Sequence, residues 1–104
     1  MATFKNKGFA VTDTEEELLA AGVLTIVHSL YISNSSNGTI AYVTVKFVDS
    51  SDSDKEYVLI NNAPIKPGSS LIFDKPINLE INDSLRIVGS DNDLLNSFLS
   101  IMEM

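Results

Sequence analysis

The segment from Val23 to Val48 constrains the fold more than any other part of the chain, because two β-rich runs flank a turn signal. Val23 to Ser33 and Ile40 to Val48 are rich in β-branched and aromatic residues, which suit a pleated and half-buried surface. Between them lies Asn37-Gly38, the dipeptide most typical of a two-residue type I′ turn. The sequence therefore predicts a long β-hairpin.

The apolar pattern predicts one register for this hairpin, with Asn37 and Gly38 as the two loop residues. Side chains alternate between the two faces of a strand, so opposite pairs share a face. The predicted core-facing pairs are Ile32 with Val43, Leu30 with Val45, and His28 with Phe47, and Leu24 and Ile26 continue the same row.

The other face of the predicted hairpin is mixed in character, and Lys46 is the only charged residue on it. Tyr is enriched at protein interfaces, where an apolar ring and a polar tip are both useful. We therefore expect this face to be a subunit interface, unless the chain's own first 21 residues cover it. The candidate interface residues are Thr25, Val27, Ser29, Tyr31, Tyr42, Thr44, Lys46 and Val48.

Length and composition indicate one globular domain spanning residues 1–104, with residues 1–8 as a flexible or docking arm. With 44% apolar residues the chain is expected to be folded, and without cysteine it has no disulfides and no thiol chemistry. A net charge of −7 and scattered Lys and Arg argue against nucleic acid as a partner.

The sequence shows no signal peptide and no apolar run long enough to span a membrane. The longest apolar stretch, Leu18 to Val27, is interrupted by Gly22 and Thr25. We therefore expect a soluble protein made in the cytoplasm, with no membrane partner.

Two segments leave their secondary structure open. Thr12 to Glu17 resembles a helix cap with an acidic first turn, so Leu18 to Ala21 is expected to form either one helical turn or a short strand. Leu95 to Met104 fits a strand, with Phe98, Ser100 and Met102 on one face, but its apolar spacing also fits a terminal helix. The strand is favoured there because it completes the sheets.

The remaining sequence alternates short strands with turns. The predicted strands are 9–11, 56–60, 71–73, 77–81 and 85–87, and the predicted turns include 61–64, Pro67-Gly68 and Asn82-Asp83. Leu85 and Ile87 are expected to face inward. About seven or eight strands at this spacing predict an all-β fold, an antiparallel β-sandwich of jelly-roll type.

No motif for catalysis or cofactor binding emerges. His28, the only histidine, has apolar neighbours in the predicted register, so it is expected to be a core or interface residue. Asp49, Asp52, Asp54 and Glu56 form an acidic cluster that could bind calcium, but the spacing of a calcium loop is absent. We therefore predict no enzyme activity, no catalytic residue and no cofactor, and leave calcium binding open.

Four strings of the sequence resemble short structural proteins of tailed bacteriophages. They are VHSLYISN at 27–34, VTVKFVDS at 43–50, APIKPGSSL at 63–71 and DSLRI at 83–87. The chain departs from that pattern at Ala20, where Pro is usual, at Lys66-Pro67, which replace Pro-Ala, and at Asn82, which replaces Gly. Each replacement is compatible with a turn.

The resemblance implies a non-enzymatic part of a virion that is present in many copies. The resemblance leaves three roles open: a neck or tail adaptor, a tail-completion protein and a head decoration protein. Its partners would be other virion proteins and further copies of the chain, and it would reside in the virion after synthesis in the host cytoplasm. One alternative is a carbohydrate- or cell-surface-binding module of a phage fibre, and another is an accessory domain of an unrelated hydrolase.

Overall fold

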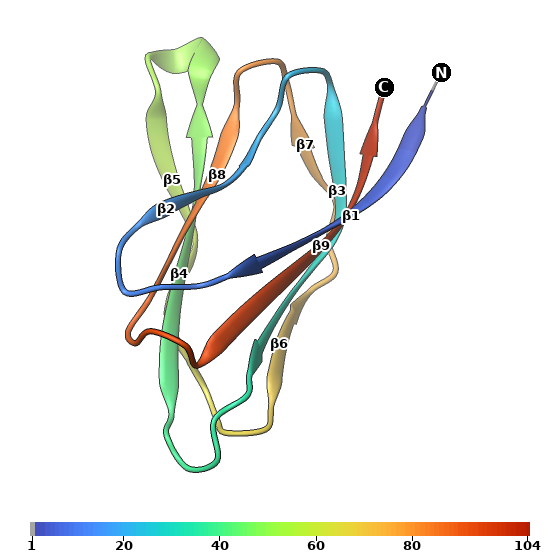
Figure 1. Cartoon of the computed structure of the whole chain (residues 1–104). Coiled ribbons are helices and arrows are strands. Elements are labelled where there is room, and N and C mark those ends of the chain that lie inside the picture. The colour runs from blue at the N-terminus through green and yellow to red at the C-terminus, as the bar shows by residue number, and fades with distance from the viewer. Residues whose placement is uncertain (1) are drawn as a thin grey trace.

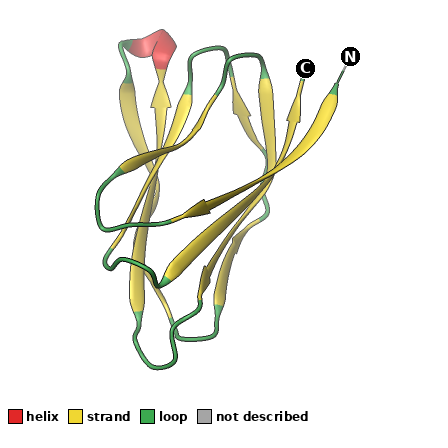
Figure 2. Cartoon of the chain, viewed as in Figure 1, coloured by secondary structure: helices red, strands yellow, loops and turns green. Residues whose placement is uncertain are grey.

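The computed structural model describes residues 2–104, which form nine strands and one 3₁₀ turn (Figures 1 and 2). The elements are β1 (Thr3–Ala10), β2 (Glu16–Ala20), β3 (Thr25–Asn34), β4 (Ala41–Asp49), η1 (Ser50–Asp52), β5 (Lys55–Ile65), β6 (Ser70–Phe73), β7 (Ile77–Leu79), β8 (Ser84–Gly89) and β9 (Leu95–Glu103). None of the helical structure in this range is long and apolar enough to cross a membrane.

Two antiparallel sheets face each other. The five-stranded sheet has the order β1-β9-β3-β6, with β7 also paired to β3, and the four-stranded sheet has the order β2-β8-β4-β5. Because β6 and β7 lie one after the other along β3, the strands fill eight positions, as in a jelly roll built from two Greek keys. The predicted fold class, an all-β antiparallel sandwich of jelly-roll type, is confirmed.

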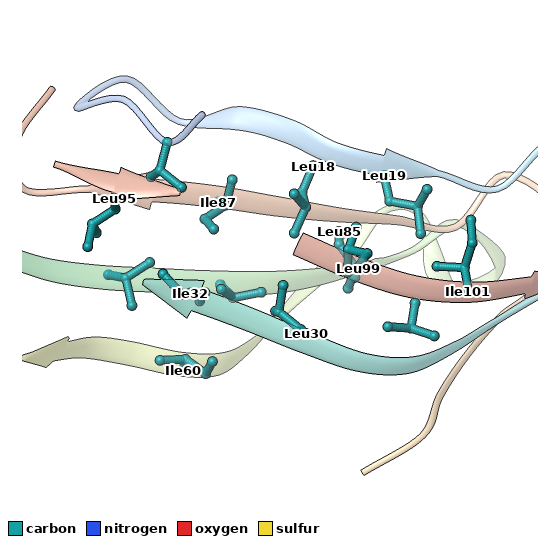
Figure 3. Close-up of a cluster of buried hydrophobic side chains, with 14 of the residues drawn as sticks. Leu18, Leu19, Leu30, Ile32, Ile60, Leu85, Ile87, Leu95, Leu99 and Ile101 are labelled. Carbon is teal, nitrogen blue, oxygen red and sulfur yellow. The ribbon is translucent and has the colours of Figure 1, made fainter. Parts of the chain in front are cut away.

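The core lies between the sheets and consists of aliphatic side chains from both of them (Figure 3). Leu30, Leu99 and Ile101 come from the five-stranded sheet, and Leu85 and Ile87 come from the four-stranded sheet. The inward orientation predicted for Leu85 and Ile87 is confirmed. Burial of such side chains is the main stabilising contribution, at about 25 cal/mol per Å² of apolar surface.

The predicted central hairpin is wrong. β3 and β4 lie in different sheets, so Ile32 pairs with Leu71 and Ser97 instead of Val43. Neither Asn37 nor Gly38 has a positive φ, so the predicted type I′ turn is absent.

The segment between β3 and β4 crosses from one sheet to the other, and buried Asn34 organises it. The Asn34 Nδ2 donates to the carbonyl oxygens of Thr39 and Ile65, both at 2.8 Å. Its Oδ1 accepts from the Ser36 N–H at 2.9 Å. These side-chain bonds stabilise a wide loop, and the local bond to Ser36 competes with the tight turn that Asn-Gly favours.

A β-bulge in β3 corrects the predicted core-facing row. The register shifts between Val27 and Ser29, so His28 is an extra residue and the inward face changes there. Before the bulge Thr25 and Val27 are buried, while Leu24 and His28 are exposed and Ile26 is half-buried. After the bulge the prediction holds, since Leu30 and Ile32 are buried. On β4, Val43 and Val45 are buried as predicted, and half-buried Phe47 packs against the core.

Three other segments differ from their predicted state or resolve an alternative. Of the two alternatives for Leu18 to Ala21, the structure has the short strand, at Glu16–Ala20, and Leu95–Glu103 is the favoured strand and not a helix. Residues 61–64, predicted as a turn, continue β5 through irregular pairing with β4. Asn62 there has φ of 48° and donates its N–H to the Thr44 hydroxyl.

The predicted N-terminal arm lies in the five-stranded sheet from Thr3 onward, because β1 pairs with β9 along its whole length. Met1 of that arm lies outside the described residues. The turn at Pro67-Gly68 is confirmed: Gly68 has φ of 75°, and the Ser69 N–H donates to the Lys66 carbonyl at 3.0 Å.

Candidate assembly surfaces

The structure divides the eight predicted interface residues among three places. Thr25 and Val27 are buried in the chain's own core. Ser29 and Tyr31 lie on the outer face of the five-stranded sheet. The other four, on β4, lie on the outer face of the four-stranded sheet: Tyr42, Thr44, Lys46 and Val48. The sequence therefore located real surface residues but joined two opposite faces of the sandwich into one.

The outer face of the five-stranded sheet carries a central row that crosses four strands. Gly8 pairs with Phe98, Phe98 with Tyr31, and Tyr31 with Ile72, and opposite residues in antiparallel strands share a face. The rings of Tyr31 and Phe98 lie 6.5 Å apart between centroids and are tilted by 59°. This row is an exposed and largely apolar strip across the sheet.

A second apolar row lies nearer the chain ends. Phe4 pairs with Met102, Met102 with Ile26, and Ile26 with Asn78. The ring of Phe4 stacks on the bulged His28, with 6.0 Å between centroids. His28 is thus a surface residue beside an aromatic ring. The predicted core position is wrong, and the predicted interface position remains open.

Small and amide side chains fill the rest of this outer face. These side chains and the two apolar rows occupy all the outward strand positions of the five-stranded sheet. We call this surface the neutral face. Its additional members are Asn6, Ala10, Ser29, Ser33, Ser70, Asn96 and Ser100. Across residues 2–104, no Asp, Glu, Lys or Arg occupies one of these outward positions.

Four large side chains of the neutral face are open to solvent. The exposed fractions are 73% for Phe4, 56% for Ile72, 46% for Phe98 and 40% for Tyr31. Single exposed apolar residues are ordinary, but Tyr31, Phe98 and Ile72 are neighbours in one row, and a contiguous group of this kind is a candidate interaction surface. The alternation of Asn96, Phe98, Ser100 and Met102 with buried residues along β9 is the sequence signal that could have revealed it.

The outer face of the four-stranded sheet is charged instead. Glu15 lies 2.9 Å from the Lys46 Nζ through one carboxylate oxygen and 3.0 Å from the Arg86 Nε through the other. Lys46 is also 3.5 Å from Glu56. The hydrogen bond from Lys46, and then that from Arg86, hold the pKa of Glu15 below its usual value. Glu15 in turn raises the pKa of Lys46.

An open depression beside this network is lined mainly by polar and charged groups, among them Glu17, Asp54, Glu56 and Ser84. Carboxylates and a paired guanidinium are ordinary groups of a solvated surface. The Glu15 carboxylate forms ion pairs with both Lys46 and Arg86, so the arrangement of these three side chains is explained as an ion-pair network.

The acidic cluster between β4 and β5 forms a capped turn. The Asp49 carboxylate accepts from the Ser51 N–H at 3.0 Å and from the Ser51 hydroxyl at 2.6 Å, which caps η1. Within the described range 2–104, no group of three or more His, Cys, Asp or Glu side chains is arranged to hold a metal ion.

Comparison with known proteins places the chain by its fold. No protein-family model and no curated protein sequence matches it. A chain from the acid-stable capsid of Helicobacter pylori bacteriophage KHP30 matches with a TM-score of 0.62 and 13% identity, over 99% of this chain and 87% of that one. A chain of the Bacillus endospore appendages, a family of disulfide-linked pili, matches with a TM-score of 0.59 and 14% identity, over 100% and 87%.

A viral particle of infectious bursal disease virus supplies a third match, with a TM-score of 0.54 and 13% identity. The match covers 97% of this chain but 30% of that one. At such identities the likeness concerns the fold, a jelly roll that occurs in capsid and pilus proteins.

Proposed function

We propose that this chain is a non-enzymatic virion structural protein of a tailed bacteriophage, which assembles in multiple copies as a neck or tail adaptor or as a head decoration protein. The observation that carries the proposal is the match to the phage KHP30 capsid chain, because it spans nearly the whole of both chains. A jelly roll of this size supplies two broad faces, which is what a repeating contact between neighbours requires.

The surfaces support an assembly role. The neutral face is broad, exposed and uncharged, whereas the opposite face carries the network of Glu15, Lys46 and Arg86. Two faces of such different character suit a subunit that has different neighbours on its two sides. The phage-like strings of the sequence, including VHSLYISN at 27–34, favour the same role.

The second candidate, a carbohydrate- or cell-surface-binding module of a phage fibre, has one observation in its favour. Tyr31 and Phe98 form an exposed aromatic pair, and Asn96 lies two residues from Phe98 on the same face. Aromatic rings beside amides can stack on and hydrogen-bond to sugars. A glycan array with the purified protein separates the two candidates.

A pilus subunit linked by disulfides is disfavoured, because the chain contains no cysteine. The appendage match therefore contributes the fold alone, since copies of this chain cannot be joined by disulfides.

Labelling of whole particles tests the proposed function. Antibodies raised against the chain are expected to decorate phage particles released from the cell that encodes it, in electron micrographs, at repeated positions on head, neck or tail. Particles that carry no label and contain none of the chain by mass spectrometry would overturn the proposal.

A further inference from the structure

We propose that the neutral face binds a second copy of this chain, face to face, with Tyr31 of each copy opposite Phe98 of the other. The inference rests on the proposed function in one respect, since it names the contact through which copies assemble. Three features support this contact: the distribution of charge, the order of residues across the sheet and the open space above Gly8.

Charge selects this face for contact between identical copies. The chain has 14 acidic and 7 basic residues, so copies that approach in most orientations bring carboxylates together. The connections between strands carry acidic groups such as Asp52 in η1 and Asp93, and the four-stranded sheet carries Glu17 and Glu56. Two neutral faces meet without like charges opposite each other and without removing an ion from water.

The same absence of charge argues against a strongly charged partner. Recognition of nucleic acid or of a basic peptide depends on opposite charges that steer the encounter and fix the register. The outward positions among residues 2–104 offer none of these on the neutral face. A surface of aromatic, aliphatic, Ser and Asn side chains is complementary to a surface of the same kind.

The central row is self-complementary when it is reversed. Across the strands its order is Gly8, Phe98, Tyr31, Ile72. A two-fold axis along the strands, between β9 and β3, turns the row over, so that each Phe98 meets the partner copy's Tyr31. The same operation brings each Ile72 over Gly8 of the other copy, as the isologous contact of a two-fold dimer requires.

Gly8 leaves the space that this arrangement needs. A Cβ atom built on Gly8 has no heavy atom within 4 Å, so the surface above it is open. Ile72, exposed by 56%, is the protruding residue at the other end of the row. An axis across the strands would instead place Gly8 over Gly8 and Ile72 over Ile72, which leaves a gap at one end and a collision at the other.

Two tyrosines provide a matched test of the face. Tyr31 and Tyr42 are 40% and 39% exposed and lie on opposite outer faces of the sandwich. In sedimentation equilibrium we expect the wild-type chain to dimerise, Tyr31→Glu and Phe98→Glu to weaken the dimer at least tenfold, and Tyr42→Glu to match wild type. Circular dichroism establishes that each variant is folded. A monomeric wild type, or equal effects of Tyr31→Glu and Tyr42→Glu, would overturn the inference.

Cross-linking tests the axis and does not depend on the tyrosine variants. Because the chain has no cysteine, Gly8→Cys and Ile72→Cys each introduce one thiol. Gly8 and Ile72 are at opposite ends of the row, three strand spacings or roughly 14 Å apart. In the proposed dimer, two thiols at the same position are therefore separated sideways by that distance, whereas position 8 of one copy lies over position 72 of the other. A short bismaleimide is expected to join them in an equal mixture of the two variants and to leave each variant alone uncross-linked. Self-cross-linking of either variant, or no cross-link in the mixture, would overturn the arrangement.

The two proposals fail in different ways. If the chain is found on particles but the neutral face shows neither dimerisation nor cross-linking, the virion role stands and this contact is wrong. If the chain dimerises through the neutral face but is absent from particles, the contact stands and the virion role is wrong.

Discussion

The Asp83 carboxylate accepts hydrogen bonds from both the backbone N–H and the hydroxyl of Ser50, each at 2.9 Å. Its second oxygen accepts from the Glu80 N–H, also at 2.9 Å. One buried carboxylate thus joins the turn after β4 to the turn before β8, at the end of the sandwich where η1 lies (Figure 1).

Replacing Asp83 with Ala should lower the free energy of unfolding by about 2 kcal/mol, because donors on both turns lose a buried acceptor. Chemical denaturation measures the change. Asp74→Ala is the control, since Asp74 is exposed and directly follows β6. Equal losses in the two variants would contradict the role assigned to Asp83.

The stability of the chain should fall in acid partly through Asp83. Burial opposes its ionisation, but the hydrogen bonds from Ser50 and Glu80 outweigh this and lower its pKa. A lowered folded-state pKa adds stability above the unfolded-state pKa, about 3.9 for Asp, and this stability is lost as the pH falls through the folded value. Denaturation of wild type and Asp83→Asn from pH 7 to pH 2 is therefore expected to show a difference that shrinks below about pH 4. A difference that is constant with pH would mean that the charge of Asp83 is irrelevant.

Glu15→Gln should destabilise the chain by at most about 1 kcal/mol, because surface ion pairs are weak even when they form a network. The substitution leaves Lys46 and Arg86 without the carboxylate between them. We expect the loss to be smaller in high salt, which screens exposed charges. Thermal melts at low and high ionic strength measure it, and Glu17→Gln, on the same face, is the control. A loss that salt does not change would point to packing instead of charge.

Gly68→Ala should destabilise by about 1 kcal/mol, because Gly68 has φ of 75° and a side chain resists that conformation. Gly38→Ala should leave stability unchanged or raise it by up to about 1 kcal/mol, since φ is not positive there and the space around it is open. Chemical denaturation of the two variants, measured side by side, decides whether Asn37-Gly38 lies in a wide loop or in a type I′ turn. A larger loss for Gly38→Ala would restore the hairpin that the sequence predicts.

These two glycines also illustrate how far the sequence determines the fold. At Lys66-Pro67-Gly68-Ser69 the turn depends on local chemistry, and the prediction is confirmed. At Asn37-Gly38 the local preference is overridden by Asn34, whose partner Ile65 is 31 residues away. The apolar pattern predicted the inward residues of β4, β8 and the second half of β3. It could not predict the bulge at His28, because the bulge arises from the pairing of β3 with β9.

The surfaces were harder to predict than the strands for the same reason. Which outward residues share a face depends on which strands are neighbours, and that is a long-range property. Tyr31 and Tyr42 look adjacent if β3 and β4 form a hairpin, yet they lie on opposite faces of the sandwich. Phe98 and Ile72 join Tyr31 only once β9 and β6 are known to flank β3.

Asn34→Ala should cost about 2 kcal/mol or more, because it removes three hydrogen bonds and leaves the Ile65 carbonyl without its side-chain donor. The same loop offers Asn37→Ala as a matched control, since Asn37 is exposed and its φ is not positive. Equilibrium denaturation is expected to separate the two variants clearly, with Asn37→Ala close to wild type. If Asn37→Ala were the more damaging of the two, the crossing from β3 to β4 would depend on the turn dipeptide. If Asn34→Ala is the more damaging, then the buried Asn34 amide directs the chain from the five-stranded sheet to the four-stranded sheet. The outward residues of β3 and β4 then lie on opposite faces of the sandwich because of the crossing at Asn34.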